Sequence, residues 1–168
     1  GLPIYTFYMP KYAGIEVDTG LPMWYAEKDG QTVVTTAYSE ASNYLCGDPT
    51  PDVYGGFGTS MVLGAFDISM QFSYSVGGLV YDSGYASLMS PPGTSTGTNI
   101  HRNMLFAWTP ENKEAPIPRF QYLDEKIAAQ SDRFLTDAGF LNFQSAQIGY
   151  TLPRSLTERF NVSRMRIY

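Results

Sequence analysis

Few residues in the chain have the types and spacing that catalysis requires. His101 is the only histidine and lies beside Arg102, with no nucleophile or orienting group at a recognisable spacing, so we expect a polar loop residue rather than a catalytic base or metal ligand. The carboxylates of the same region are Glu111, Glu114, Asp124 and Glu125. Nothing else nearby indicates the paired acids of a hydrolase. We therefore expect solvated charges, no catalytic residue and a protein that is not an enzyme.

Metal and cofactor sites are equally poorly supported. Asp48 and Asp52, with loop carbonyls, have the oxygen ligands that calcium prefers, but the 12-residue ligand spacing of a calcium loop is absent. Cys46 is the single cysteine, so no internal disulfide can form. Two glycine pairs, at residues 55–56 and 77–78, lack the strand-to-helix context of a phosphate loop and indicate close backbone approach or bulges. We expect no metal and no cofactor.

Aromatic side chains are the stronger candidates for ligand contact. They make up 15% of the chain and include 13 tyrosines. Aromatic faces stack on sugar rings, although long loops also use aromatic residues to build small cores of their own. The candidate substrate-binding residues, all in segments expected to be external loops, are Trp24, Tyr25, Tyr44 and Trp108.

The elements that must position these residues are best read from residues 66–76. The run F-D-I-S-M-Q-F-S-Y-S-V alternates apolar and polar side chains for about the length that a tilted strand needs to cross a bilayer. Strands of soluble proteins are usually about 5–6 residues long. A long strand with one apolar face and one face of Ser and Gln is typical of a barrel wall, although a soluble sheet also alternates.

The preceding residues predict a tight hairpin. If Leu63 pairs with Phe66 across Gly64 and Ala65, both strands place their apolar sets on the same face, and a one-residue slip would not. We expect this face to contact lipid. The residues expected to face lipid are Phe57, Met61, Leu63, Phe66, Ile68, Met70 and Phe72.

Charge is scarce and acidic in balance. Charged residues are 16% of the chain, against about 25% in ordinary globular proteins, and Asp67 is the only charged residue between Val53 and Tyr81. The net charge of −5 and the lack of a basic stripe argue against a nucleic-acid partner. The one basic concentration is expected to be solvated or lumen-facing beside a turn: Arg154, Arg159, Arg164 and Arg166. The sequence contains no run of 18 apolar residues, so it does not predict a membrane helix.

The whole chain reads as all-β, with five antiparallel wall strands and two long loops. The strands are expected near residues 4–12, 54–63, 66–78, 140–152 and 162–168, and the loops at 13–52 and 81–139. A small hairpin is expected around residues 28–30, a segment without a packed core at 81–97, and a short helix at 99–108 with Thr98 or Asn99 as its N-cap. Short joins on one side and long loops on the other are typical of outer-membrane barrels.

A family resemblance rests on segments that occur in one order along the chain. They are Y-A-G-I-E-V-D-T-G-L-P-M-W-Y (12–25), D-V-Y-G-G-F-G-T-S (52–60), G-A-F-D-I-S (64–69), W-T-P-E-N (108–112), I-P-R (117–119), S-D-R-F-L (131–135) and I-G-Y-T-L-P (148–153). Together they resemble the C-terminal part of SusC/RagA-like TonB-dependent outer-membrane transporters of Bacteroidetes. The resemblance spans essentially all 168 residues.

The resemblance implies a large transmembrane β-barrel of about 22 strands with a plugged lumen, long extracellular loops, and an outer-membrane location in a Gram-negative bacterium. It implies active import of oligosaccharides or peptides, energised by TonB and shared with a SusD-like surface lipoprotein. The chain lacks a plug and a TonB-contacting segment, and five strands cannot close a barrel. We therefore expect residues 1–168 to be one piece of a larger wall that contacts the rest of the barrel, the plug and outer-membrane lipid.

One alternative comes from a different class of protein. A soluble, extracellular β-sandwich that binds carbohydrate with its tyrosines would also alternate and be rich in aromatic residues. A wall piece requires detergent or fractionates with the outer membrane, whereas a sandwich module stays in solution.

Overall fold

The computed structural model describes residues 1, 3–91 and 99–168. It divides into two compact units that interleave along the chain. We call Thr50–Gly78 with Ala138–Tyr168 the wall unit, and Gly1–Pro49 with Leu79–Asp137 the loop unit. Each unit is described by itself.

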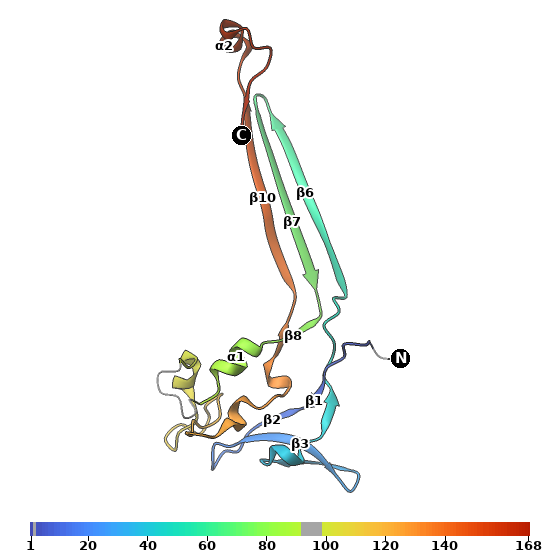
Figure 1. Cartoon of the computed structure of the whole chain (residues 1–168), viewed down its shortest axis with the longest axis vertical. Coiled ribbons are helices and arrows are strands. Elements are labelled where there is room, and N and C mark those ends of the chain that lie inside the picture. Colours follow the sequence, from blue (N-terminus) through green and yellow to red (C-terminus); the bar gives the residue numbers. More distant parts are fainter. Residues whose placement is uncertain (2, 92–98) are drawn as a thin grey trace. The chain divides into compact units, whose positions relative to one another are not determined.

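The wall unit is a four-stranded antiparallel sheet in the order β11-β10-β7-β6. Figure 1 shows its three long strands side by side. Its elements are β6 (Val53–Leu63), β7 (Phe66–Val76), β10 (Phe140–Thr151), α2 (Arg154–Thr157), η5 (Glu158–Phe160) and β11 (Arg166–Ile167). β6 and β7 have 11 residues each and β10 has 12, about twice the common strand length.

The predicted hairpin register is confirmed. Leu63 pairs with Phe66, and Phe57 with Phe72, so the apolar sets of β6 and β7 share a face. Gly64, with φ of 62°, provides the left-handed backbone of the two-residue turn. β7 ends at Val76 rather than at residue 78, because Gly77 and Gly78 also have positive φ and leave the extended conformation.

A bulge in β10 explains a change of phase in its sequence. Phe143 pairs with Phe72, whereas Ser145 pairs with Gln71, so Gln144 is an extra residue opposite β7. Apolar side chains therefore occupy odd positions before the bulge and even positions after it. The set that shares the apolar face of β7 is Leu141, Phe143, Ala146, Ile148 and Tyr150.

The loop unit is built from short strands and helical turns around a small core. Its elements are β1 (Tyr8–Pro10), β2 (Tyr12–Ile15), β3 (Pro22–Lys28), β4 (Gln31–Thr35), η1 (Tyr38–Glu40), β5 (Asn43–Leu45), β8 (Leu79–Tyr81), α1 (Ser83–Leu88), η2 (Arg102–Phe106), η3 (Glu125–Ala128), η4 (Asp132–Phe134) and β9 (Leu135–Asp137). The pairings are β1 with β5, β2 with β3 and β4, and β8 with β9.

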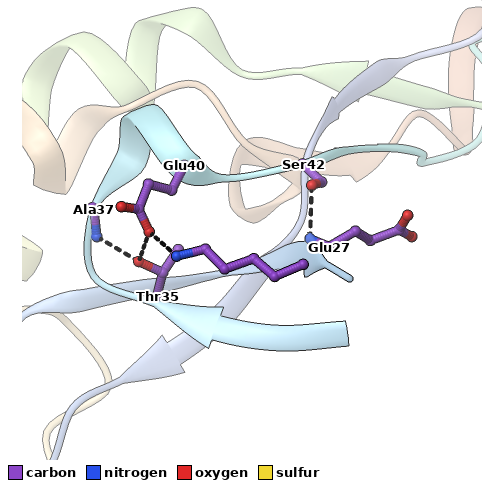
Figure 2. A network of polar contacts seen from close by, with 6 residues as sticks. Glu27, Thr35, Ala37, Glu40 and Ser42 are labelled. Carbon is purple, nitrogen blue, oxygen red and sulfur yellow. Dashed lines mark hydrogen bonds and ion pairs between the residues drawn. The ribbon is translucent and has the colours of Figure 1, made fainter. Parts of the chain in front are cut away.

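The small hairpin expected around residues 28–30 is present as β3 and β4, with Asp29 and Gly30 in left-handed conformations at the turn. Polar contacts join the segment after β4 to the β3–β4 hairpin (Figure 2). Lys28 Nζ lies 2.7 Å from Glu40 Oε2, and the backbone N–H of Glu27 donates to Ser42 Oγ at 2.9 Å.

A packed core lies where the sequence predicts plain loop. Residues 81–91 contain α1, whose N-cap Asp82 accepts a hydrogen bond from the Tyr85 N–H at 2.7 Å. The expectation of a loop without a core was wrong for this part, because α1 buries Ala86 and its C-cap Met89 despite the Gly and Ser content of the segment. The buried cluster is Ala86, Met89, Met104, Ile117, Ile127 and Phe134. Residues 92–98 of the same expected loop lie outside the described residues.

The expected helix at 99–108 is shorter than predicted. It is the 3-10 helix η2, and His101 is its N-cap, with Nδ1 accepting a hydrogen bond from the Asn103 N–H at 3.2 Å. Asn99 does not take that place, and Thr98 lies outside the described residues.

Two expected wall strands differ from the structure. Residues 4–12 are not one strand: the chain turns near residues 4–5, β1 pairs with β5, and β2 begins a different sheet after Pro10, which lacks an N–H and interrupts the run. Residues 162–168 contribute only the two residues of β11. Asn161 is left-handed with φ of 55°, and the Val162 N–H donates to Thr157 O at 3.2 Å, so the chain is still reversing direction there.

Candidate functional site

The wall unit presents a continuous apolar face that is open to its surroundings. Phe57 and Met61 are each 54% exposed and Leu63 is 60% exposed. Phe66 and Met70 are likewise exposed, while Ile68 and Phe72, in the middle strand, are partly covered by neighbouring side chains. An apolar surface of this kind on adjacent strands is typical of contact with lipid or with another protein.

Aromatic side chains form two rows across this face. Phe72 lies between Phe57 and Phe143, with ring centroids 4.9 and 5.2 Å away, and Phe66 packs against Tyr150 at 4.7 Å. The two rows are separated by six residues of β7, which corresponds to about 20 Å along the strand. Aliphatic residues fill the space between them. Aromatic rows on both sides of an aliphatic band are typical of strands that cross a bilayer.

The opposite face is mostly polar and contains one ion pair. Asp67 on β7 pairs with Arg166 on β11, and Gly149 of β10 lies between them. A Cβ at residue 149 would lie 2.6 Å from both Asp67 Oδ1 and Arg166 Nε. Glycine therefore allows the guanidinium group to cross β10 and reach the carboxylate. Large apolar exceptions on this face are Tyr54, Val62 and Phe140.

Both edges of the wall sheet lack a neighbour within the described residues. β6 has β7 on one side only, and β11 has β10 on one side only. An unprotected edge strand usually carries charges, proline or bulges that prevent further pairing. β6 has none of these over its 11 residues. Its free backbone N–H and C=O groups are suited to pair with another strand.

The aromatic candidates for substrate contact occupy different environments. Trp24 is 1% exposed in β3, and its ring lies edge-on to Tyr38 at 5.1 Å. It is a core residue and is not available for stacking on a ligand. Pro22 and Ala26, two residues away on either side, are buried too, so one face of β3 packs inward; the sequence P-M-W-Y-A is apolar throughout and does not reveal which face that is.

Trp108 contacts a loop that is distant from it in sequence. Its indole Nε1 donates to Val17 O at 3.1 Å, and its ring covers Gly20, where a Cβ would lie 2.4 Å from the ring. This packing gives Trp108 a structural role. Its half-buried state leaves only part of the ring accessible.

Tyr25 and Tyr44 are both half-buried. Tyr44, in β5, lines a cavity of about 650 Å³ together with Lys11, Cys46 and Asp132. Burial and the nearby Asp132 raise the pKa of the Cys46 thiol, so Cys46 is not an activated nucleophile. The structure does not bring the four aromatic candidates together in one site.

A second cavity of about 720 Å³ was not indicated by the sequence. It is lined by Tyr38 of η1, Tyr81 of β8, residues of α1, and Lys126 of η3. Its residues come from four elements separated by up to 91 positions, so no local pattern could indicate it. Burial raises the pKa of both phenols, and the neighbouring Tyr38 raises that of Tyr81 further.

Arg133 is a buried cation of the loop unit that the sequence does not single out. Its guanidinium lies over the rings of Tyr12 and Phe134, 5.3 and 5.4 Å from their centroids, and Nη1 donates to Ile127 O at 3.0 Å. Burial lowers the pKa of this guanidinium, which stays protonated. It joins β2, η3 and η4 through cation–π contacts and a hydrogen bond.

The loop unit also carries an exposed apolar surface, which we call the apolar loop surface. Leu105 is 86% and Phe106 is 62% exposed, although the adjacent Met104 is buried in the core. Its members are the exposed apolar residues of two nearby segments, Ile100, Leu105, Phe106, Phe120, Tyr122 and Leu123, of which Ile100, Leu105 and Phe120 line one pocket.

The polar candidates for chemistry do not form an active site. The ring of His101 caps η2 and lies edge-on to Tyr85 at 4.8 Å. In the part of the chain that the structure describes, no group of three or more His, Cys, Asp or Glu residues is placed to hold a metal ion. No helix among the described residues is both long and apolar enough to cross a membrane.

Comparison with known proteins identifies one receptor and two solved structures that the chain resembles. No family model matches the chain. It is 28% identical over 144 residues to TonB-dependent receptor P3 of Formosa agariphila, which corresponds to 86% of this chain and 13% of that receptor. Two solved structures are similar. The RagAB peptide importer in its open-open state has a TM-score of 0.76 and 29% identity over 96% of this chain and 17% of its own. The RagAB peptide transporter has a TM-score of 0.73 and 27% identity, again over 96% of this chain, and 18% of its own.

The chain thus spans under a fifth of the length of the proteins it matches. The described residues of this chain form mostly antiparallel β structure, and their sheet does not close into a barrel. These relatives are a TonB-dependent receptor and a peptide importer or transporter. The chain is accordingly similar to a stretch of SusC/RagA-like TonB-dependent receptors.

Proposed function

We propose that the wall unit is part of the barrel wall of an active outer-membrane transporter driven by TonB, and that the loop unit is an external loop region. The observation that carries the proposal is the combination of a long sheet, an exposed apolar face and two open edges. An apolar face with these exposures is costly in water and favourable in hydrocarbon. The open edges allow the wall to continue on both sides.

In this proposal the residues expected to face lipid keep that assignment. They share one face with Phe143, Ile148 and Tyr150 of β10, which extends the lipid-contacting surface to a third strand. The polar face with the Asp67–Arg166 ion pair then faces the lumen. A soluble sandwich is less well supported, because its apolar face would be covered by a second sheet and not left about half exposed.

The cargo proposed for the transporter is a short peptide, with oligosaccharide as the second candidate. Two similar structures are a peptide importer and a peptide transporter, at 29% and 27% identity. Oligosaccharide was favoured by the aromatic loop residues. These residues support a sugar cargo only weakly, since Trp24 is buried and Trp108 packs on Gly20.

A surface lipoprotein of the SusD-like class is proposed as partner at the apolar loop surface. Leu105 and Phe106 expose large apolar side chains next to a folded core, and such patches are typical of protein–protein contacts. Replacing both with serine should weaken co-purification of the lipoprotein and leave outer-membrane abundance unchanged. Replacing Val34 of β4, an apolar residue that is 50% exposed and does not belong to this surface, with serine is the control. Unchanged co-purification of the double variant would reject this surface.

The transport function itself is tested in the source bacterium. A deletion of the complete gene should abolish growth on an oligopeptide mixture as sole nitrogen source, and the wild-type gene should restore it. Growth of the deletion strain on peptides, together with failure on a defined oligosaccharide, would move the cargo assignment to sugars. Normal growth on both would contradict an import function.

A further inference from the structure

The walls of the cavity lined by Tyr38, Tyr81 and Lys126 pack against other residues of the loop unit. The Tyr38 hydroxyl donates to Gln130 O at 2.8 Å, and its ring rests against the buried Trp24. The Tyr81 ring lies edge-on to Phe134 of the core at 6.1 Å. Ala86, 6% exposed and part of the same core, also lines the cavity. The walls are thus held by the core of the loop unit, and the cavity volume of about 720 Å³ is within the range of small-ligand sites.

Lys126 is the one charged residue in the described lining of this cavity. Lys28 and Lys113 of the loop unit pair with Glu40 and Asp18, whereas Lys126 has no ion-pair partner among the described residues. The described lining contains no carboxylate. An ammonium group donates hydrogen bonds and accepts none. The complementary ligand group is therefore an anion that only accepts.

Hydroxyl groups supply the remaining polarity. Within the described part of the chain, the hydroxyls of Tyr81, Ser83 and Ser90 line the cavity without a hydrogen-bond partner. A hydroxyl both donates and accepts, as a peptide backbone does with its N–H and C=O groups. Ala86, Ala128 and Ala129 add small apolar side chains to the lining.

We propose that this cavity binds the carboxyl end of a short peptide, with the terminal carboxylate at Lys126 Nζ and the last peptide groups at the hydroxyls of Tyr81, Ser83 and Ser90. The inference rests on the proposed peptide import and names a subsite for that cargo. A neutral oligosaccharide carries no group that matches the single ammonium. A peptide carries one such group at its end whatever its sequence.

The test uses the full-length transporter purified in detergent with its lipoprotein partner. The probes are a nonapeptide of Ala, Gly and Ser labelled with a dye at its N-terminus, the same peptide with an amidated C-terminus, and a labelled hexasaccharide of uronic acids. Binding is followed by fluorescence anisotropy. The wild-type complex should bind the free acid about tenfold more tightly than the amide, the size expected for one charge-assisted hydrogen bond.

Lys126→Gln should lower the affinity for the free acid to that for the amide. Lys113→Gln, which removes a lysine of the same unit that already pairs with Asp18, should change neither affinity. Tyr81→Phe removes one hydroxyl without changing charge, and should weaken both peptides equally. Equal outer-membrane abundance of the variants verifies folding.

Retention of the free-acid preference in Lys126→Gln would overturn the subsite, while peptide import by that variant would leave the proposed function intact. Lys126-dependent binding of the uronic hexasaccharide without binding of either peptide would overturn the peptide assignment. Absence of both peptide binding and peptide import in the wild type would overturn the import proposal and this inference with it.

Discussion

At the scale of single residues, neighbouring positions on β7 should respond oppositely to charge. Met70 is on the apolar face and Gln71 on the polar face near the middle of the strand. Met70→Lys should destabilise the folded wall by about 2–4 kcal/mol if the residue lies near the bilayer midplane, and Gln71→Lys should be nearly neutral. Denaturant-dependent unfolding in lipid vesicles measures both. Equal losses at the two positions would contradict the assignment of faces.

A pH effect is expected at the hairpin of the loop unit. Lys28 lowers the pKa of the Glu40 carboxyl, so the contact contributes above the carboxyl's ordinary pKa and is lost as pH falls through the lowered folded value. Hydrogen exchange of residues 23–42, corrected for the intrinsic rate, should therefore rise in acid. Glu40→Gln should exchange at the faster rate already at neutral pH. An acid response that persists in Glu40→Gln would assign the effect to another group.

The sequence was most informative about residues whose environment is set by local periodicity. The register from Phe57 to Phe72 followed from two alternations that agree in only one arrangement. Trp24 was assigned to ligand contact because an aromatic side chain serves a core and a binding surface equally well. The cation–π position of Arg133 depends on partners up to 121 positions away, which no local pattern reveals.

At the scale of elements, the bulge in β10 should be essential for the continuity of the apolar face. Deleting Gln144 would force residues 140–143 to pair in the opposite phase, which turns Leu141 and Phe143 to the polar face. We expect the variant to lose the heat-modifiable, folded form on detergent gels. Gln144→Ala keeps the extra residue and should fold normally. A folded deletion variant would mean that the strand accommodates the shift elsewhere.

The stability of the loop unit should depend on its buried residues and not on its exposed apolar residues. Met104 is 7% exposed in the core, so Met104→Ala should cost about 2–5 kcal/mol and expose the loops to protease. Leu105→Ala, at a position 86% exposed, should leave protease resistance unchanged. Limited proteolysis of the full-length protein in outer-membrane vesicles compares the two. Protease sensitivity in both variants would indicate that Leu105 also packs in the complete assembly.

Elements were predicted well where the pattern was long and poorly where it was short. The three long strands and the β3–β4 hairpin were expected at nearly their observed bounds. α1 was missed because its Ser and Gly favour loops, whereas burial of Ala86 and Met89 stabilises the helix through tertiary packing. The expected strand at 4–12 alternates as a wall strand does, yet Pro10 and the pairing with β5 assign it to the loop unit.

At the scale of the whole molecule, we expect the four-stranded sheet to be one part of a larger wall. Its apolar face is exposed, and neither edge has a neighbouring strand among the described residues. The similarity to RagAB over 96% of the chain agrees with a piece of a much longer receptor. The architecture followed from strand length, charge scarcity and the asymmetry of loops. The cavity at Lys126 did not, because it exists only after distant loop segments have packed.

The central claim is that one face of the wall unit contacts hydrocarbon and the other contacts water. The most direct test places single nitroxide labels at consecutive positions 67–72 of β7 in the full-length receptor, with Cys46 replaced by Ser, and reconstitutes it in lipid vesicles. Accessibility to oxygen and to a water-soluble nickel chelate should alternate with period two, with oxygen favoured at Ile68, Met70 and Phe72. Chelate accessibility that is uniform along the strand, or highest at those three positions, would contradict the account.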